Sequence, residues 1–177
     1  MNFCLATSAE KVLLLPGDEF VPAPTIASTH AITINKSAEN IWPWIVQIGQ
    51  DRGGFYSYTL LENLIGCRMK NADRIHSQWQ NLGEGDAVQL HPKFPRMLVK
   101  KIETDRHLVL FQQTSFVWIW AFVLKQLDCD RSRLLIRTRI FSDRWIVTLP
   151  LYPVMTLGHY CMERKMLMGI KRRCESN

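Results

Sequence analysis

The spacing of apolar residues changes from a strand period to a helix period in the second half of this chain, and this change limits the possible folds more than any other feature. Between residues 86 and 141 apolar and polar side chains alternate with a period of two, which is typical of strands. From Met155 to Ile170 the apolar stripe recurs at intervals of three and four, which is typical of one face of a helix. The sequence therefore predicts a run of antiparallel strands followed by one long C-terminal helix.

The first third of the chain predicts one strand and two short helices. The strand covers His30–Asn35, where apolar residues alternate with polar ones. Ser37 is a suitable N-cap for a helix that is closed by Gly49, and Pro43 is expected to kink this helix because proline removes a backbone donor. A second helix is expected over about residues 56–65.

Five further strands are expected after residue 85, in a sheet with one face in water. In the last of them, Leu134 and Ile136 alternate with Arg133, Arg137 and Arg139. Such alternation is typical of an antiparallel sheet with one solvated face. The expected strands are Asp86–His91, Arg96–Glu103, Leu108–Gln113, Ser115–Lys125 and Ser132–Phe141.

Length and local composition indicate one domain behind an irregular arm. A chain of 177 residues fits a single domain. Several prolines before residue 25 predict that residues 1–29 form an extended arm and that residues 30–177 form the domain. The five cysteines are scattered without a CxxC pair, no signal peptide is evident, and no apolar stretch reaches the roughly 20 residues of a spanning helix. We therefore expect a cytoplasmic protein without a transmembrane segment.

The charge and the motifs narrow the choice of partners. The formal net charge of +6 raises a nucleic acid or an anionic membrane surface as a partner, but no nucleic-acid-binding motif accompanies it, so no nucleic acid is expected. The histidines lack metal-ligand spacing, and the Gly-Gly turn after residue 52 does not match a nucleotide fingerprint. The sequence therefore predicts neither a metal nor a cofactor.

Several stretches of the sequence carry a resemblance to one superfamily. They are Ile32–Gly49 with its Trp42-Pro-Trp44, then Arg52–Tyr58, Leu61–Leu64, Ala72–Ile75 and Met162–Leu167. Together they resemble the SRPBCC superfamily (the START, birch-pollen-allergen-like and polyketide cyclase-dehydratase group), and more closely a bacterial subgroup of unknown function. The resemblance covers nearly the whole chain. It implies an α+β helix-grip fold, in which a curved antiparallel sheet wraps around a long C-terminal α-helix, with two short helices after the first strand.

The resemblance also implies a cavity between the sheet and the C-terminal helix. Methionine gives an adaptable lining and aromatic rings give shaped walls, although the same side chains would equally fill an ordinary core. The expected function is therefore the binding of a small hydrophobic or amphipathic molecule, such as a lipid or polyketide. The residues expected to line this site are Trp44, Tyr56, Tyr58, Trp118, Trp120, Phe122, Met155, His159, Met162 and Met166.

An enzyme of the cyclase, dehydratase or hydrolase type is the alternative. Its candidate catalytic residues are Asp73, Arg74, His76 and Glu163, because carboxylates and imidazoles are the common groups of acid–base catalysis. A structural role is favoured for Asp73 and Arg74, and pairing with a surface arginine is favoured for Glu163. A third hypothesis is an interaction protein that offers the arginines of the last strand to an acidic partner.

Overall fold

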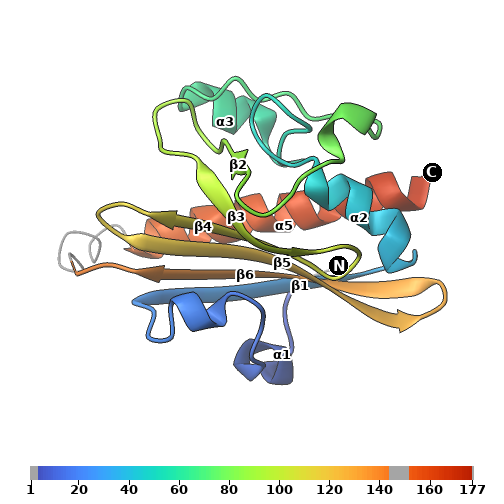
Figure 1. The fold of residues 1–177 in the computed structure, drawn as a ribbon, viewed down its shortest axis with the longest axis horizontal. Helices are drawn as coiled ribbons and strands as arrows, with labels where there is room; N and C mark the ends of the chain where they lie inside the picture. The colour runs from blue at the N-terminus through green and yellow to red at the C-terminus, as the bar shows by residue number, and fades with distance from the viewer. Residues whose placement is uncertain (1–3, 144–151, 177) are drawn as a thin grey trace.

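The computed structural model describes residues 4–143 and 152–176, with the side chains of the second range from Leu157 onward (Figure 1). Six antiparallel strands form one sheet in the order β1-β6-β5-β4-β3-β2, and helix α5 (Tyr152–Ser176) lies along one face of it. This arrangement confirms the predicted α+β helix-grip fold. The strands are β1 (Ile26–Ile34), β2 (Ala87–Val88), β3 (Met97–Glu103), β4 (His107–Gln113), β5 (Val117–Asp128) and β6 (Arg131–Phe141).

The short helices follow the first strand much as the sequence predicts. Helix α2 (Ala38–Val46) begins directly after Ser37, and Pro43 lies inside it. Helix α3 (Thr59–Leu64) is shorter than expected. Its start is delayed because Tyr56 has a left-handed φ of 57° and a buried side chain, so the chain there cannot form a helical turn. The remaining helical turns are α1 (Ser8–Val12), η1 (Asp18–Phe20) and η2 (Ser77–Trp79).

Strand β1 begins four residues earlier than predicted. Its first residue, Ile26, pairs with Ile140 of β6, and the ladder continues to the pair Ile34–Ser132. The long partner strand extends the pairing into a segment whose own sequence does not alternate clearly. Neighbouring backbone groups, rather than local side-chain pattern, therefore set this boundary.

The expectation of a solvated outer face on β6 is wrong, because the N-terminal arm covers it (Figure 1). Arg137 is 4% exposed and lies 3.2 Å from the Asp18 carboxylate, which is also 3.1 Å from Arg139. Arg133 pairs with Glu10 of the same arm at 2.8 Å. The Arg137 guanidinium also donates to the backbone oxygens of Glu10, Lys11 and Leu13. The acidic partner of this basic face is the chain's own arm.

The inner face of the sheet packs against α2 and α5 to form the main core. The predicted inward face of α2 is confirmed, since Ile41, Ile45 and Ile48 are all buried. They join inward side chains of β1, β4, β5 and β6 and the second half of α5 in one hydrophobic cluster. Among the described residues, no helix is both long enough and apolar enough to span a membrane.

Candidate functional site

A buried carboxylate lies between the sheet and α5. Glu163 is 2% exposed, so the expected pairing with a surface arginine is wrong. Its Oε1 accepts hydrogen bonds from Trp120 Nε1 at 3.0 Å and Thr138 Oγ1 at 3.1 Å, and its Oε2 contacts His30 Nδ1. His159 Nε2 lies 3.0 Å from Oε1. We call these five residues the Glu163 cluster.

Strand register and helix periodicity bring the Glu163 cluster together. Trp120 of β5 pairs with Thr138 of β6, and Thr138 pairs with Ser28 of β1, so their side chains form one row on the inner face. His30 lies two residues beyond Ser28 and shares that face. Residues 159 and 163 are one turn apart on α5 and face this row.

Hydrogen bonding determines the charge state of the cluster. Burial alone would raise the pKa of Glu163, but hydrogen bonds and charge interactions with His159 and His30 lower the pKa to about 2. Burial would lower the pKa of His159, yet the neighbouring Glu163 carboxylate outweighs it and raises that pKa. Glu163 is therefore ionised at neutral pH and favours the protonated imidazole of His159. Among the described residues, no group of side chains is arranged to hold a metal ion.

Two polar groups next to the cluster are unsatisfied. Ser28 Oγ and Trp118 Nε1 are buried and have no hydrogen-bond partner within the described parts of the chain. Trp118 belongs to the next row of the sheet and stacks on Trp120, with 6.3 Å between the ring centroids. Because β1 and α5 run in the same direction, this row lies toward the start of α5. The cluster thus continues into an aromatic surface with unused hydrogen-bonding capacity.

The predicted lining residues toward the second half of α5 fill the interior. Trp44, Tyr56, Phe122 and Met166 are buried in the main core. The rings of Trp44 and Tyr56 meet edge to face at 5.8 Å, and the Tyr56 hydroxyl donates to the Trp44 carbonyl at 3.1 Å. It also accepts a hydrogen bond from Gln47 Nε2 at 2.9 Å. These contacts make this part of the predicted lining a packed core.

The other predicted lining residues do not meet at one place. Tyr58 is 38% exposed at the surface, with Lys165 Nζ 5.2 Å above its ring. Met162 is half-buried, and its sulfur lies 3.5 Å from Ser57 Oγ. The Met155 side chain lies outside the described residues. Trp118, Trp120 and His159, as described above, belong to the Glu163 cluster or adjoin it.

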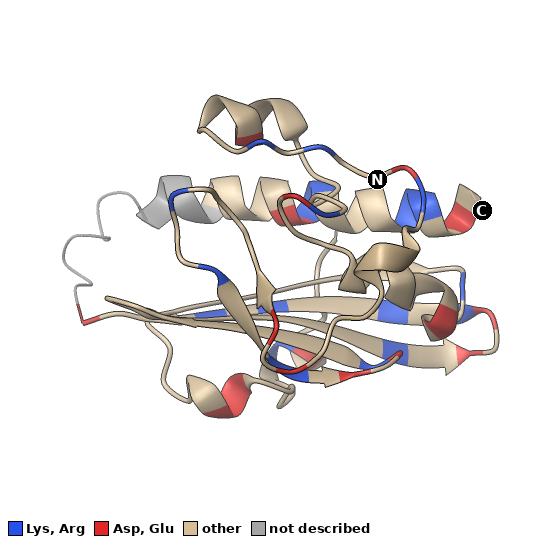
Figure 2. Ribbon diagram, turned by 45° about the horizontal axis from the view of Figure 1, so that its top comes forward, with Lys and Arg blue, Asp and Glu red and all other residues tan. Residues whose placement is uncertain are grey.

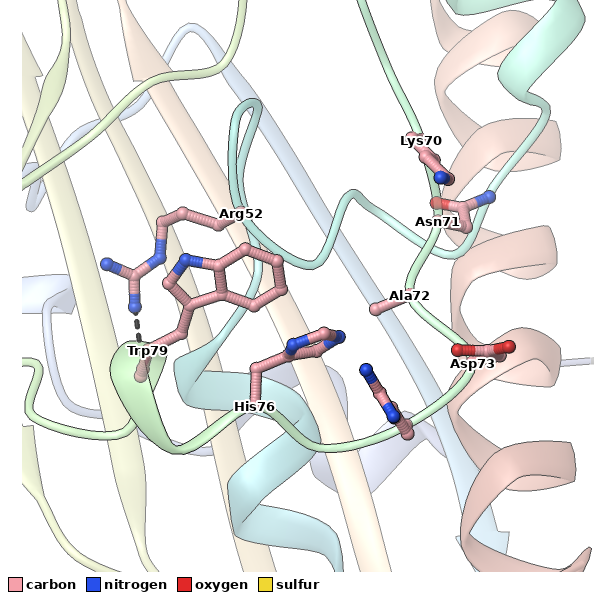
Figure 3. Close-up of a pocket in the computed structure, with 8 residues that line it drawn as sticks. Arg52, Lys70, Asn71, Ala72, Asp73, His76 and Trp79 are labelled. Atoms are coloured by element: carbon pink, nitrogen blue, oxygen red, sulfur yellow. Dashed lines mark hydrogen bonds between the residues drawn. The ribbon is translucent and has the colours of Figure 1, made fainter.

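The structure brings Asp73, Arg74 and His76 together, but in a different place from Glu163. They line a surface pocket of about 430 Å³ in the chain that follows α3 (Figure 3). Figure 3 shows Lys70, Asn71 and Asp73 along one side and Arg52, His76 and Trp79 along the other. The rings of His76 and Trp79 are 4.4 Å apart. No residue of the Glu163 cluster lines this pocket.

A buried glutamine, which the sequence reasoning did not single out, fixes the loop that carries this pocket. Gln47 of the turn after α2 is fully buried, and its amide donates to the Arg74 carbonyl at 3.2 Å and accepts from the His76 N–H at 3.1 Å. These bonds support the structural role favoured for this loop. A glutamine that directly follows the apolar face of α2 was the available signal.

The sequence reasoning also overlooked the sheet residues of the Glu163 cluster. His30 is in phase with Ile32 and Ile34, and Thr138 is in phase with Ile136. Polar residues at inward positions of a strand must find partners inside, so the alternation carried a signal for both. The alternation did not predict that the partner of both residues would be the same carboxylate, Glu163 of α5.

The fold and the buried cluster define this chain as a helix-grip protein with a charged group in its interior. No family model and no curated protein sequence matches it. Among solved structures it is similar to the hypothetical protein jhp0584 of Helicobacter pylori, with 13% identity, a TM-score of 0.55, and 94% of this chain and 98% of that one covered. It is also similar to SSP2350 of Staphylococcus saprophyticus, with 10% identity, a TM-score of 0.52, and coverages of 85% and 92%.

A third similar structure is MLL2253 of Mesorhizobium loti, with 12% identity, a TM-score of 0.51, and coverages of 86% and 98%. At these identities the similarity concerns the fold alone. The comparisons therefore support the fold and show no superfamily, and the function must be argued from this chain's own residues.

Proposed function

We propose that this chain binds a small amphipathic molecule between the sheet and the first half of α5, with the polar end of the molecule next to Glu163. The observation that carries the proposal is an ionised, buried carboxylate beside two unsatisfied polar groups, Ser28 Oγ and Trp118 Nε1. The aromatic surface of Trp118 and Trp120 would hold the apolar part of the ligand.

Stability alone gives little reason to keep such a cluster. Replacing a buried ion pair by well-packed apolar residues is often neutral or stabilising by roughly 1–4 kcal/mol. Each buried polar group left without a partner costs about 1–3 kcal/mol. A ligand that accepts hydrogen bonds from Trp118 and Ser28 would remove the second cost, which favours a binding role for the cluster.

The free groups indicate the chemistry of the ligand. The Trp118 indole can only donate a hydrogen bond, and the Ser28 hydroxyl can donate or accept. The His159 side chain is 34% exposed, so one edge of the ring can also reach a ligand. A neutral carbonyl at the end of an apolar body fits these groups, because an ionised carboxylate would be repelled by the Glu163 carboxylate. Polyketide-like molecules have this chemistry.

Thermal unfolding with three ten-carbon probes tests this proposal. We expect 2-decanone to raise the melting temperature. Decanoate should do so much less, because the ionised Glu163 repels its head group, and so should decylamine, because its head group only donates and the Glu163 oxygens already have hydrogen-bond donors. Trp118→Phe should weaken 2-decanone binding by roughly 3- to 10-fold, because it removes one hydrogen bond. Trp79→Phe, in the surface pocket, is the matched control and should bind like the wild type. Equal binding of all three probes, or no binding of 2-decanone, would refute the proposed site.

Acid–base catalysis at the same place is the second candidate function. The observation that favours it is the pairing of partly exposed His159 with buried Glu163, since a carboxylate that orients an imidazole is a common catalytic unit. Asp73, Arg74 and His76 would take no part, because they line the separate pocket. Release of 4-nitrophenol from 4-nitrophenyl decanoate by the wild type, at a rate that Glu163→Gln lowers at least roughly 100-fold, would support an enzyme. Equal rates for the wild type and Glu163→Gln would exclude catalysis by this pair of residues.

A further inference from the structure

Helix α3 has its polar and apolar faces inverted. Its one buried side chain is Glu62, which is 3% exposed. The large apolar residues point outward: Leu60 is 82% exposed, Leu64 81%, Ile65 70% and Leu61 50%. We call these four residues the α3 patch. Surface helices of globular proteins normally turn their apolar side to the core, so this arrangement is the reverse of the usual one.

Side-chain hydrogen bonds hold α3 in this orientation. The Asn63 side chain accepts from the Met69 N–H at 2.6 Å and donates to the Met69 carbonyl at 3.2 Å. The Asn71 side chain donates to Thr59 Oγ1 at 3.0 Å at the start of the helix. The segment that follows α3 is thereby fastened to both ends of the helix, so the α3 patch is a built feature of the fold rather than a frayed end.

Both faces of α3 are unfavourable for a protein surrounded only by water. Neither carboxylate oxygen of Glu62 has a hydrogen-bond partner among the described residues, and burial raises its pKa to about 7. Contiguous exposed apolar side chains usually mark a surface that another body covers. The inversion is therefore best explained by contact of the outward face with an apolar phase.

The charges next to the α3 patch indicate what that body is. Arg68 and Lys70 are exposed directly after the helix, and neither takes part in an ion pair within the described parts of the chain. Figure 2 shows Lys and Arg positions on the chain that runs beside α3. Leucines flanked by cations suit an interface that is apolar inside and anionic at its surface, and the net charge of +6 adds long-range attraction.

A second copy of this chain fits the patch less well. In a two-fold symmetric contact both copies contribute the same surface, so a contact centred on the α3 patch would bring the Arg68 and Lys70 of both copies, four cations in all, to one interface. Such like-charge contacts oppose association. An anionic lipid surface instead places phosphates opposite these two cations.

We infer that the α3 patch docks this protein on the surface of an anionic lipid bilayer. Leu60 and Leu64 enter the head-group region, and Arg68 and Lys70 contact lipid phosphates. This inference goes beyond the proposed ligand site and does not depend on it, because α3 lies outside the Glu163 cluster.

Flotation with vesicles tests the inference on the full chain. Vesicles of phosphatidylcholine alone are compared with vesicles that contain 30% phosphatidylglycerol, at low and high salt. Leu60→Ser/Leu64→Ser removes two exposed leucines and should lower the partition coefficient roughly ten-fold or more. Val12→Ser/Leu14→Ser is the matched control, because these side chains are 83% and 86% exposed on the arm, on the opposite side of the sheet (Figure 1).

A second pair of variants tests the charges. Arg68→Gln/Lys70→Gln should lower binding to the anionic vesicles roughly ten-fold and weaken its salt dependence. Lys11→Gln/Lys125→Gln removes the same charge elsewhere and should lower binding less than roughly three-fold. Failure of the wild type to float, equal binding to neutral vesicles, or equal losses in the control variants would overturn the inference. So would a dimer in solution that Leu60→Ser/Leu64→Ser converts to a monomer.

Discussion

At the scale of single residues, the informative feature is that two carboxylates on neighbouring helices are buried in opposite circumstances. Glu163 is surrounded by groups that stabilise its charge, which lowers its pKa to about 2. Glu62 has no hydrogen-bond partner in the part of the chain that the structure describes, and burial raises its pKa to about 7. Burial alone therefore does not fix the ionisation of a side chain, because its hydrogen-bond partners decide the sign of the shift.

The free energy of unfolding should depend on Glu163 within a defined pH window. Its carboxylate contributes stability above its unfolded pKa of 4.5, and this contribution is lost as the pH falls toward about 2. The raised pKa of His159 adds stability that is present below 6.5 and lost as the pH rises above it. The loss caused by Glu163→Gln should thus be largest between about pH 4.5 and 6.5, at about 3 kcal/mol.

Urea unfolding at pH 3, 5.5 and 8.5 measures this difference. The pKa shifts of Glu163 and His159, which lie 3.0 Å apart, set this profile. Glu84→Gln, at an exposed position, is the control and should change stability by less than about 0.5 kcal/mol at each pH. The same loss at all three pH values would show that the charge of the cluster does not matter.

Glu62→Gln should stabilise the protein in alkaline solution. The folded pKa of about 7 lies above the unfolded value of 4.5, so the native state becomes less stable as the pH rises through this range. Replacing the carboxyl by a neutral amide removes that loss and should add about 2 kcal/mol at pH 8, with little effect at pH 4.5. Thermal unfolding at both pH values is the measurement, and a pH-independent effect would contradict this account.

At the scale of secondary-structure elements, periodicity predicted the strands and α5 but could not predict what covers them. The alternation in β6 correctly separates Leu134 and Ile136 from the arginines, yet it cannot tell water from an acidic arm. The arm carries Asp18, whose ion pair with Arg137 joins residues 119 positions apart. Such a contact forms only when the chain folds, so no local sequence pattern predicts it.

The same limit explains the error at Glu163. The predicted stripe on α5 includes Met162, and Glu163 lies at its edge, so spacing alone does not decide whether the Glu163 side chain faces the sheet. Inward-facing His30 and Thr138 on the strands decide in favour of Glu163. The candidate was therefore predictable from the sequence, whereas its orientation required the strand register.

Asp18→Asn should destabilise the attachment of the arm to the sheet. The Asp18 carboxylate accepts from the Leu15 N–H at 3.0 Å and lies between the buried Arg137 guanidinium and the half-buried Arg139 guanidinium. Removing its charge leaves these cations without their partner and should cost about 3–5 kcal/mol in unfolding free energy. Glu19→Gln is the matched control, because the pair of Glu19 with Lys101 is exposed and should contribute less than about 1 kcal/mol. Equal losses in urea unfolding would contradict the role of Asp18.

At the scale of the whole molecule, the sheet lies between two layers, the N-terminal arm and helix α5, and no sequence pattern connects these two segments. Adjacent residues of β6 point to opposite sides, with Arg137 bound to the arm and Thr138 bound to Glu163. The arm on one face of the sheet and α5 on the other therefore both bind side chains of β6. Because neither layer is complete without that strand, we expect them to unfold as one cooperative unit.

This cooperativity gives a prediction about opposite faces of the sheet. Asp18→Asn acts on the outer face, whereas near-ultraviolet circular dichroism reports mainly on tryptophans of the inner face, such as Trp44 and Trp120. In urea, the midpoint from that signal should fall by the same amount as the midpoint from proteolysis of the arm. Coincident transitions are the test of a single unit. An arm that becomes cleavable while the tryptophan signal keeps its wild-type midpoint would instead identify the arm as a separable layer, and the ion pairs of Asp18 would then stabilise only its attachment.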